Sequence, residues 1–219
     1  MITLYAFGPR VHPGMKGKGR DLRAQWALEE TGLDYQIHEV DFLGGELDSP
    51  AYRRLSPFGQ VPAIDDEGFV IAESAAVVLY LAEKAGSLIP ADFLGRMRVT
   101  QWCFAALATV ERPVWEIQMI DAFHKGESAG RRTALVKEAR HRFDDIERRL
   151  EGRAWLADDD FTVADILLAT VLRGIRKTDL LSSYPGLKAY HERATMRPAW
   201  QRTLASCAER QGVSVADIR

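Results

Sequence analysis

Cysteine is scarce in this chain of 219 residues, which contains only Cys103 and Cys207. The two lie far apart in the sequence, so they indicate neither a disulfide framework nor a metal cluster, and a reducing cytoplasm is the expected compartment. Histidines are equally scattered, without partners at metal or catalytic-triad spacing. We therefore expect no metal site, and we expect these four at the surface or in loops: His38, His124, His141 and His191.

An excess of charge of one sign and long apolar runs are absent as well. The formal net charge is −2 and the pI is about 6.2, so no strong field would attract nucleic acid or an anionic membrane. No apolar run approaches the ~20 residues that a membrane-spanning helix needs. The segment from Met1 to Tyr5 begins a strand-like pattern at once, without a basic and then apolar leader. These features predict a cytoplasmic protein without nucleic-acid or membrane partners.

The first part of the chain alternates short apolar strands with helices, in a chain whose composition is that of an ordinary globular protein. Gly32 stands where a glycine commonly ends a helix, and the acidic stretch before Gly68 suits a hairpin turn. The expected order is strand, helix, strand, strand, strand, helix, over Ile2–Phe7, Asp21–Thr31, Tyr35–Val40, Val61–Ile64, Phe69–Ile71 and Ser74–Ala85. A single helical turn is expected near Ala51–Arg54, between the second and third strands.

Helical periodicity dominates the second part. Helices are expected over Phe93–Phe123, with Pro113 marking a kink or break, and over Thr133–Leu150, Thr162–Arg176 and Leu187–Met196, the last helix of the chain. Thr162 and Asp165 have the spacing of a capping box. The chain should therefore have two domains. A thioredoxin-like α/β domain (βαβ-ββα) is expected over residues 1–84, a linker over 85–91 and an all-helical domain over 92–219.

The most informative string runs from Ser56 to Ile64, and Glu73-Ser74 follow nine residues later. If the Val61–Pro62 bond is cis, the N–H and C=O of Val61 point out of the sheet and can pair with an extended, peptide-like ligand. Ser74, at the start of a helix, suits a carboxylate, and Glu73 suits an ammonium group. Each motif alone is more often a plain turn or cap. Together at this spacing they favour a site for a γ-glutamyl peptide.

The chain resembles the cytosolic glutathione transferases, in a bacterial, serine- or theta-like pattern, across nearly its full length. The matching segments are Leu4-Tyr5, Arg23–Leu33, Ser56–Ile64, Glu73–Leu81 and Phe161–Ile166. The resemblance implies a thioredoxin-like domain, a helical C-terminal domain, a homodimer and a role in detoxification. It also implies that the first of two groups holds the cysteinyl-glycine part of glutathione and the second its γ-glutamyl end: Gln60, Val61 and Pro62, then Glu73 and Ser74.

The chain departs from this family where the glutathione sulfur is activated. Serine-type members carry a hydroxyl or thiol four or five residues before the arginine of the first helix, and here those places hold Gly19 and Lys18. No Ser, Thr or Cys occurs between Thr3 and Thr31. Lowering the pKa of a thiol from about 8.5 by two units requires roughly 2.7 kcal/mol, which one hydrogen bond to a charged group nearly supplies. Some other donor must therefore act.

Three kinds of group remain candidates to replace the missing hydroxyl or thiol. Backbone amides around Gly19 and Arg20 can bind a thiolate at the start of the helix. A cation of the preceding loop can lie beside the sulfur, the candidates being Arg10, His12, Lys18 and Arg20. Tyr5 can donate as in tyrosine-type members, although a tyrosine at this place in a first strand is more often part of the core. We favour the amides together with a cation, and the lack of a loop cysteine disfavours a mechanism through a protein thiol.

A second, apolar substrate is expected to bind on the helical side of the site. The candidate residues are Phe7, Phe104, Trp115 and Met119, although aromatic residues at helical spacing more often form core. The predicted function is a glutathione transferase that uses the glutathione thiolate to attack an apolar electrophile. Two alternatives are a glutathione-dependent disulfide or peroxide reductase, and a non-catalytic member that binds glutathione or another protein.

Overall fold

The computed structural model describes residues 1–124 and 129–219. The chain divides into two compact units, which we call the first unit, Met1–Gly86 with Arg197–Arg219, and the second unit, Ser87–Met196. The boundary after Gly86 falls within the expected linker. The C-terminal residues 197–219, however, group with the first unit, whereas the sequence placed them in the helical domain.

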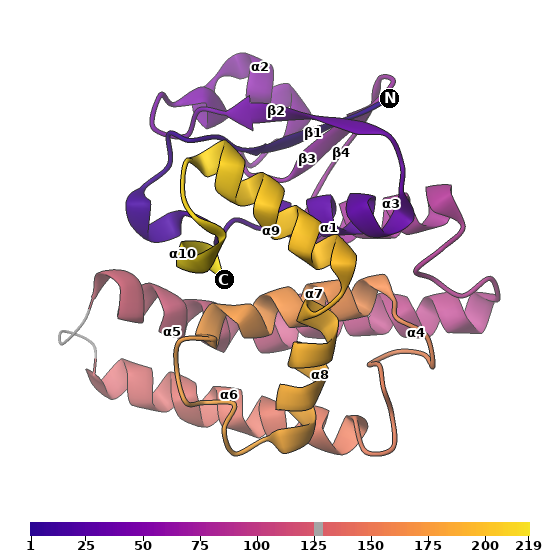
Figure 1. Ribbon diagram of the computed structural model, residues 1–219, viewed down its shortest axis with the longest axis vertical. Coiled ribbons are helices and arrows are strands. Elements are labelled where there is room, and N and C mark those ends of the chain that lie inside the picture. Colours follow the sequence, from indigo (N-terminus) through magenta and orange to yellow (C-terminus); the bar gives the residue numbers. More distant parts are fainter. Residues whose placement is uncertain (125–128) are drawn as a thin grey trace. The chain divides into compact units, whose positions relative to one another are not determined.

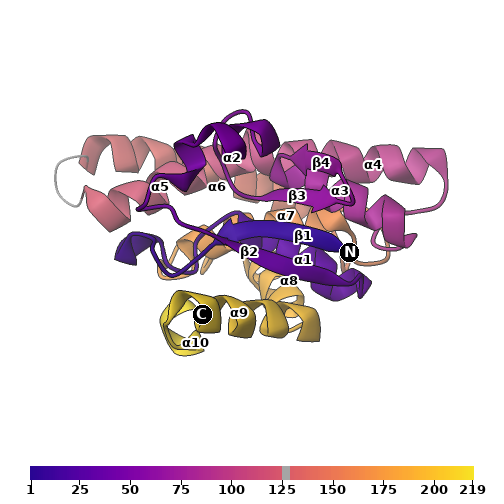
Figure 2. The ribbon, with the colours of Figure 1, turned by 90° about the horizontal axis from the view of Figure 1, so that it is seen from above.

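The first unit is built on a four-stranded sheet with the order β2-β1-β3-β4. The strands are β1 Ile2–Phe7, β2 Tyr35–Val40, β3 Ala63–Asp66 and β4 Phe69–Ala72. Figure 2 shows β1 between β2 and β3; it runs parallel to β2 and antiparallel to β3. The predicted βαβ-ββα arrangement is confirmed. Strand β3 begins two residues later than expected, because Pro62 has no N–H to give to a ladder.

Three helices complete the predicted part of this unit. Helices α1 Asp21–Thr31 and α3 Ser74–Ala85 lie on one face of the sheet and α2 Pro50–Leu55 on the other (Figure 1). Gly32 ends α1 in the left-handed conformation, at φ 69°, as its position predicted. The sequence indicated α2 only as a single turn, and the Ser49 hydroxyl, which accepts the Tyr52 N–H, starts it earlier.

The expectation that the helix ending near Met196 is the last one is wrong. Helices α9 Pro198–Gln211 and α10 Val215–Ile218 follow it, and both belong to the first unit. The sequence treated Pro198 as a stop, but a proline at the first position of a helix lacks only an N–H that would have no helical partner. Helix α9 lies beside α1 (Figure 1), where the rings of Trp26 and Trp200 are 4.7 Å apart.

The second unit is helical, as predicted. Its elements are α4 Phe93–Phe104, the π-helical segment η3 Ala105–Val110, α5 Glu111–Phe123, α6 Ala129–Arg149, α7 Val163–Leu172, the 3-10 turn η4 Arg173–Ile175 and α8 Pro185–Thr195. The distortion expected at Pro113 lies just before it, where the Glu111 N–H bonds to the carbonyl of Ala106, five residues back. A proline ring crowds the preceding turn, and the wider π turn accommodates it. No helix in the described parts of the chain is long and apolar enough to cross a membrane.

One histidine is not where the sequence placed it. His38, His124 and His141 are exposed, but His191 lies in α8, which packs against α7, and its Nε2 is buried. Burial lowers its pKa to about 4, and the charges of Arg173 and Arg176 act in the same direction. His191 is therefore a partly buried, neutral side chain whose Nε2 faces the interior.

The capping box at the start of α7 is confirmed. The buried Asp165 carboxylate accepts the N–H of Thr162 at 2.8 Å, the N–H of Leu156 at 2.8 Å and the hydroxyl of Tyr190 at 2.9 Å. Burial raises the pKa of this carboxyl, and these donors oppose the rise. One side chain thus connects the start of α7 to the segment before it and to α8.

We expect Asp165→Ala to lower the free energy of unfolding by about 2–4 kcal/mol, because several buried donors lose their acceptor at once. Thermal unfolding followed by circular dichroism measures this effect. The matched control is Asp160→Ala, which changes an exposed carboxylate in the same loop. Equal melting temperatures for the two variants would contradict the assignment.

Candidate functional site

The two sequence motifs meet at one edge of the sheet. In the antiparallel ladders Tyr5 pairs with Ala63, and Ala63 pairs with Ala72. The residues just before β3, Val61 and Pro62, therefore lie beside the end of β1, and Glu73-Ser74 follow the end of β4 at the same edge. The loop from Gly8 to Gly19 also starts there.

Three side-chain contacts hold the segment before β3. The Ser56 hydroxyl accepts the Gln60 N–H at 3.0 Å, and the Tyr52 hydroxyl donates to the Gln60 carbonyl at 3.1 Å. The Val61 side chain is buried against Tyr52, and the Val61–Pro62 bond is cis. Ser56 and Tyr52 hold the backbone of Gln60 in place, a role that the sequence motif did not indicate. They leave the peptide groups around Val61 outside the β1–β3 ladder.

The start of α3 combines a hydroxyl, a cation and a strained residue. Ser74 is the first residue of the helix, is 5% exposed, and its Oγ accepts a hydrogen bond from Arg23 Nη1 at 3.0 Å. The preceding Glu73 is exposed and has a φ of 71°, in the left-handed region that costs a non-glycine residue about 1–3 kcal/mol. A helix N-terminus with an arginine beside it suits a carboxylate. The sequence used Arg23 only as a point of reference, and its hydrogen bond to Ser74 makes it a further candidate residue of the site.

The predicted sulfur-activating residues lie at both ends of the loop after β1. Arg10 is exposed and pairs with Asp41 at 2.5 Å, and His12 Nδ1 accepts the Gly14 N–H at 3.1 Å at the start of a 3-10 turn. Gly19 and Arg20 directly precede α1. Their assignment as sulfur ligands stays a prediction.

The Tyr5 ring packs against neighbouring side chains of the first unit. Its ring centroid is 4.9 Å from that of His38 and 6.0 Å from that of Tyr52, and it contacts the buried cluster of Val40, Tyr52 and Val61. Burial raises its pKa, and the carboxylates of Asp65 and Glu46 add to the rise. These contacts favour the packing role over the catalytic one.

A side chain at position 19 would be crowded by its neighbours. A Cβ atom on Gly19 would lie 1.9 Å from Asp21 Oδ1 and 2.9 Å from a ring carbon of Phe7. Asp21 is only 1% exposed and is paired with Arg210. Burial raises the pKa of Asp21, and the positive charge of Arg210 opposes the rise. The sequence missed Asp21, because an acid in a first helical turn reads as a simple partner of the helix dipole.

The residues proposed for a second substrate are distributed over both units. In the first unit Phe7 is half-buried and meets Phe42 edge-to-face, with centroids 5.6 Å apart. In the second unit Phe104 is 66% and Trp115 is 42% exposed, and Met119 lies one turn after Trp115 on α5. These exposures exclude the reading of Phe104 and Trp115 as core. A pocket shared by these residues stays a prediction, and Phe42 is an addition from the structure.

Two families of known proteins match the chain. The family described as glutathione S-transferase, N-terminal domain, matches residues 22–84. The family described as glutathione S-transferase, C-terminal domain, matches residues 117–198. The first match contains the Ser56–Ser74 segment and the second contains the α7 capping box.

Individual relatives extend the match over most of the chain. Glutathione S-transferase F9 of Arabidopsis thaliana is 32% identical over 196 residues, which cover 84% of this chain and 91% of the relative. Disulfide-bond oxidoreductase YfcG of Escherichia coli is 30% identical over 195 residues, covering 81% of this chain and 86% of the relative.

Solved structures have the same fold. A glutathione transferase from Burkholderia graminis with two glutathione molecules bound per subunit superimposes with a TM-score of 0.82 at 27% identity, covering 94% of this chain and 88% of the other. A glutathione transferase family member from Pseudomonas fluorescens, with two glutathione molecules bound, gives 0.81 at 25% identity, covering 92% and 91%.

We expect Gly19→Ser to destabilise the protein by about 1–3 kcal/mol, because the new side chain must displace Asp21 or Phe7. Urea unfolding measures the loss. The control Gly130→Ser places the same side chain in open space on α6 and should change stability by less than about 1 kcal/mol. A Gly19→Ser protein as stable as the parent would show that the space beside Asp21 is not restrictive.

Proposed function

The chain belongs to the glutathione transferase family, and from this premise we propose that it binds glutathione in the first unit and uses the thiolate to attack an apolar electrophile. The observation that carries the proposal is the Arg23–Ser74 hydrogen bond at the start of α3, on the same sheet edge as Val61. This arrangement supports a site for a carboxylate next to one for an extended peptide. A γ-glutamyl peptide has both groups.

Each part of glutathione has a counterpart in this arrangement. The γ-glutamyl carboxylate binds the Ser74 hydroxyl and the first amides of α3, with Arg23 as a nearby cation. The γ-glutamyl ammonium binds the exposed carboxylate of Glu73. The cysteinyl-glycine part pairs with the Val61 backbone beside Gln60 and Pro62, as an added strand would. The two solved relatives described with bound glutathione support this ligand.

The sulfur then lies near the end of β1, where α1 begins. A helix N-terminus stabilises a negative charge by about 0.3–2 kcal/mol, which is less than the roughly 2.7 kcal/mol needed to lower the thiol pKa by two units. We therefore propose that the amides around Gly19 and Arg20 act together with a cation of the loop, drawn from Arg10, His12, Lys18 or Arg20. Tyr5 is the alternative donor.

The apolar side chains at the end of β1 favour an apolar electrophile as the second substrate. Phe7 and Phe42 provide an aromatic surface at the end of β1 in the first unit. In the second unit Phe104, Trp115 and Met119 offer an apolar contact surface. We propose that Phe7 and Phe42 hold the apolar part of the second substrate, and the part assigned to Phe104, Trp115 and Met119 stays a prediction from the sequence.

A second candidate function is the glutathione-dependent reduction of disulfides. The relative named disulfide-bond oxidoreductase YfcG supports it, as do solved relatives with two glutathione molecules bound. In such a reaction one glutathione thiolate displaces a thiolate from the substrate disulfide, and a second glutathione thiolate displaces the other half and leaves as glutathione disulfide. No protein cysteine is required, in agreement with the composition of the loop. A non-catalytic glutathione-binding role is the remaining alternative.

Membership of the family supports the proposals on assembly, location and physiological role. We propose a homodimer in the cytoplasm, with detoxification as the physiological role. Neither a nucleic acid nor a membrane is proposed as a partner.

We expect Ser74→Ala to raise the Kd for glutathione by about 10–100-fold, because a hydrogen bond to a charged group contributes roughly 1.5–3 kcal/mol. Isothermal titration calorimetry measures the affinity, and circular dichroism checks the fold. Ser183→Ala, an exposed serine of the second unit, serves as the control and should bind as the parent does. Unchanged affinity in the Ser74→Ala protein would refute the assigned γ-glutamyl site.

Turnover separates the candidate functions. With glutathione present, we expect the parent protein to conjugate an aryl halide, because the thiolate displaces the halide. Turnover of a small disulfide alone would instead support the reductase. Glutathione binding without turnover of either substrate would leave the non-catalytic role as the function.

A further inference from the structure

Arg210, on α9, reaches three groups around the start of α1. Its Nε donates to the carbonyl of Phe7 at 2.9 Å, Nη1 to Gln25 Oε1 at 3.2 Å and Nη2 to Asp21 Oδ2 at 3.2 Å. The side chains of Arg210 and Asp21 are 4% and 1% exposed. The guanidinium thus connects the end of β1 with the first turns of α1 in a buried site.

The residues that follow Arg210 hold the loop before α1. Gln211 accepts the Gly17 N–H through its Oε1 at 2.8 Å, and its carbonyl accepts Lys16 Nζ at 2.7 Å. Ile218 of α10 packs so close to Gly17 that a Cβ there would lie 2.5 Å from it. The C-terminal segment of the chain therefore holds the loop to which the proposed function assigns sulfur activation.

Asp21 places a buried carboxylate at the start of α1, where the glutathione thiolate is proposed to bind. It is the first residue of α1, and its Oδ1 is buried beside Gly19 with no hydrogen-bond partner among the described residues. At pH values where Asp21 is ionised, an unbalanced carboxylate here would raise the pKa of a thiol bound at this helix terminus by about one to two pH units. Arg210 from α9 is the cation that faces Asp21, and Tyr52 from α2 is a second titratable group that responds to its charge.

We propose that Arg210 is a positioning residue for the sulfur end of the site. It neutralises Asp21 and holds Phe7 and the first turn of α1 in place, so that the N-terminal amides of this helix keep a positive field for the glutathione thiolate. This inference rests on the proposed function, because it concerns a thiolate bound at Gly19 and Arg20. Helix α9, which the sequence did not predict, thereby takes part in activating the glutathione sulfur.

The experiment measures the pKa of the thiol of bound glutathione, from the ultraviolet absorbance of the thiolate at a series of pH values in the full-length protein. In Arg210→Gln this pKa should rise by about one to two pH units at pH values above the raised pKa of Asp21, because the ionised carboxylate is then no longer balanced. Affinity for S-methylglutathione, which has no ionisable sulfur, should stay within about 2-fold of the parent, because the γ-glutamyl and peptide contacts are unchanged.

A second substitution separates charge from packing. In the double variant Asp21→Asn with Arg210→Gln both charges are gone, and the thiol pKa should return to within about half a pH unit of the parent value. A purely structural role for Arg210 would leave the double variant as defective as the single one. Asp21→Asn alone should lower the thiol pKa, which provides an independent test if Arg210→Gln does not fold.

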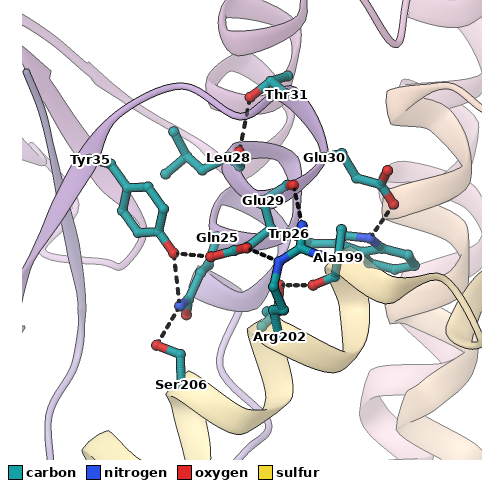
Figure 3. A network of polar contacts seen from close by, with 11 residues as sticks. Gln25, Trp26, Leu28, Glu29, Glu30, Thr31, Tyr35, Ala199, Arg202 and Ser206 are labelled. Carbon is teal, nitrogen blue, oxygen red and sulfur yellow. Dashed lines mark hydrogen bonds and ion pairs between the residues drawn. The ribbon is translucent and has the colours of Figure 1, made fainter.

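The matched control is Arg202→Gln on the same helix. Arg202 pairs with Glu29 at 2.6 Å near the other end of α1, where it also donates to the Glu29 carbonyl at 2.8 Å (Figure 3). Its loss removes another, more exposed ion pair between α9 and α1 and should leave the thiol pKa unchanged.

The possible outcomes separate a failure of the proposed glutathione function from a failure of the role assigned to Arg210. A parent protein whose bound glutathione keeps the thiol pKa of free glutathione would overturn the proposed function itself. A lowered pKa in the parent that persists in Arg210→Gln would overturn only the role of Arg210. Failure of the double variant to restore the parent value, or an equal rise in Arg202→Gln, would do the same.

Discussion

The antiparallel register between β1 and β3 is the constraint on which the candidate site depends. Pairing Tyr5 with Ala63 sets Val61 beside the end of β1, and the ladder from Ala63 to Ala72 brings Glu73-Ser74 to the same edge. A shift of one residue would turn every side chain of β3 to the other face and would separate these groups. The buried Leu4 and Ile64, which are paired in this register, oppose such a shift.

Different physical interactions serve the two ends of the proposed ligand. At the γ-glutamyl end a side-chain hydroxyl, a helix terminus and a buried arginine converge around Ser74. At the sulfur end Gly19 has no side chain, because Asp21 Oδ1 occupies the space that a Cβ would need. A side chain at position 19 would thus be crowded, and electrostatics around α1 replace the missing hydroxyl in the proposed mechanism.

Much of the fold could be predicted because its signals are local. Alternating apolar strands, Gly32 at the end of α1 and the Thr162–Asp165 box each depend on neighbours in sequence. The prediction failed where one residue allows two local outcomes. Pro198 can end one helix or begin the next, and it begins α9. His191 has an ordinary sequence environment, and only the packing of α8 against α7 takes its Nε2 out of water.

The sequence by itself determined the two classes of domain, the strand and helix order of the first 86 residues, and the family to which the site motifs belong. These follow from periodicity, caps and short motifs, all of which act over a few residues. Only the tertiary structure decided that α9 packs on α1 and pairs Arg210 with Asp21, residues that are 189 positions apart. Contacts at such separation leave no periodic trace in the chain, because they arise only when folding brings the two surfaces together.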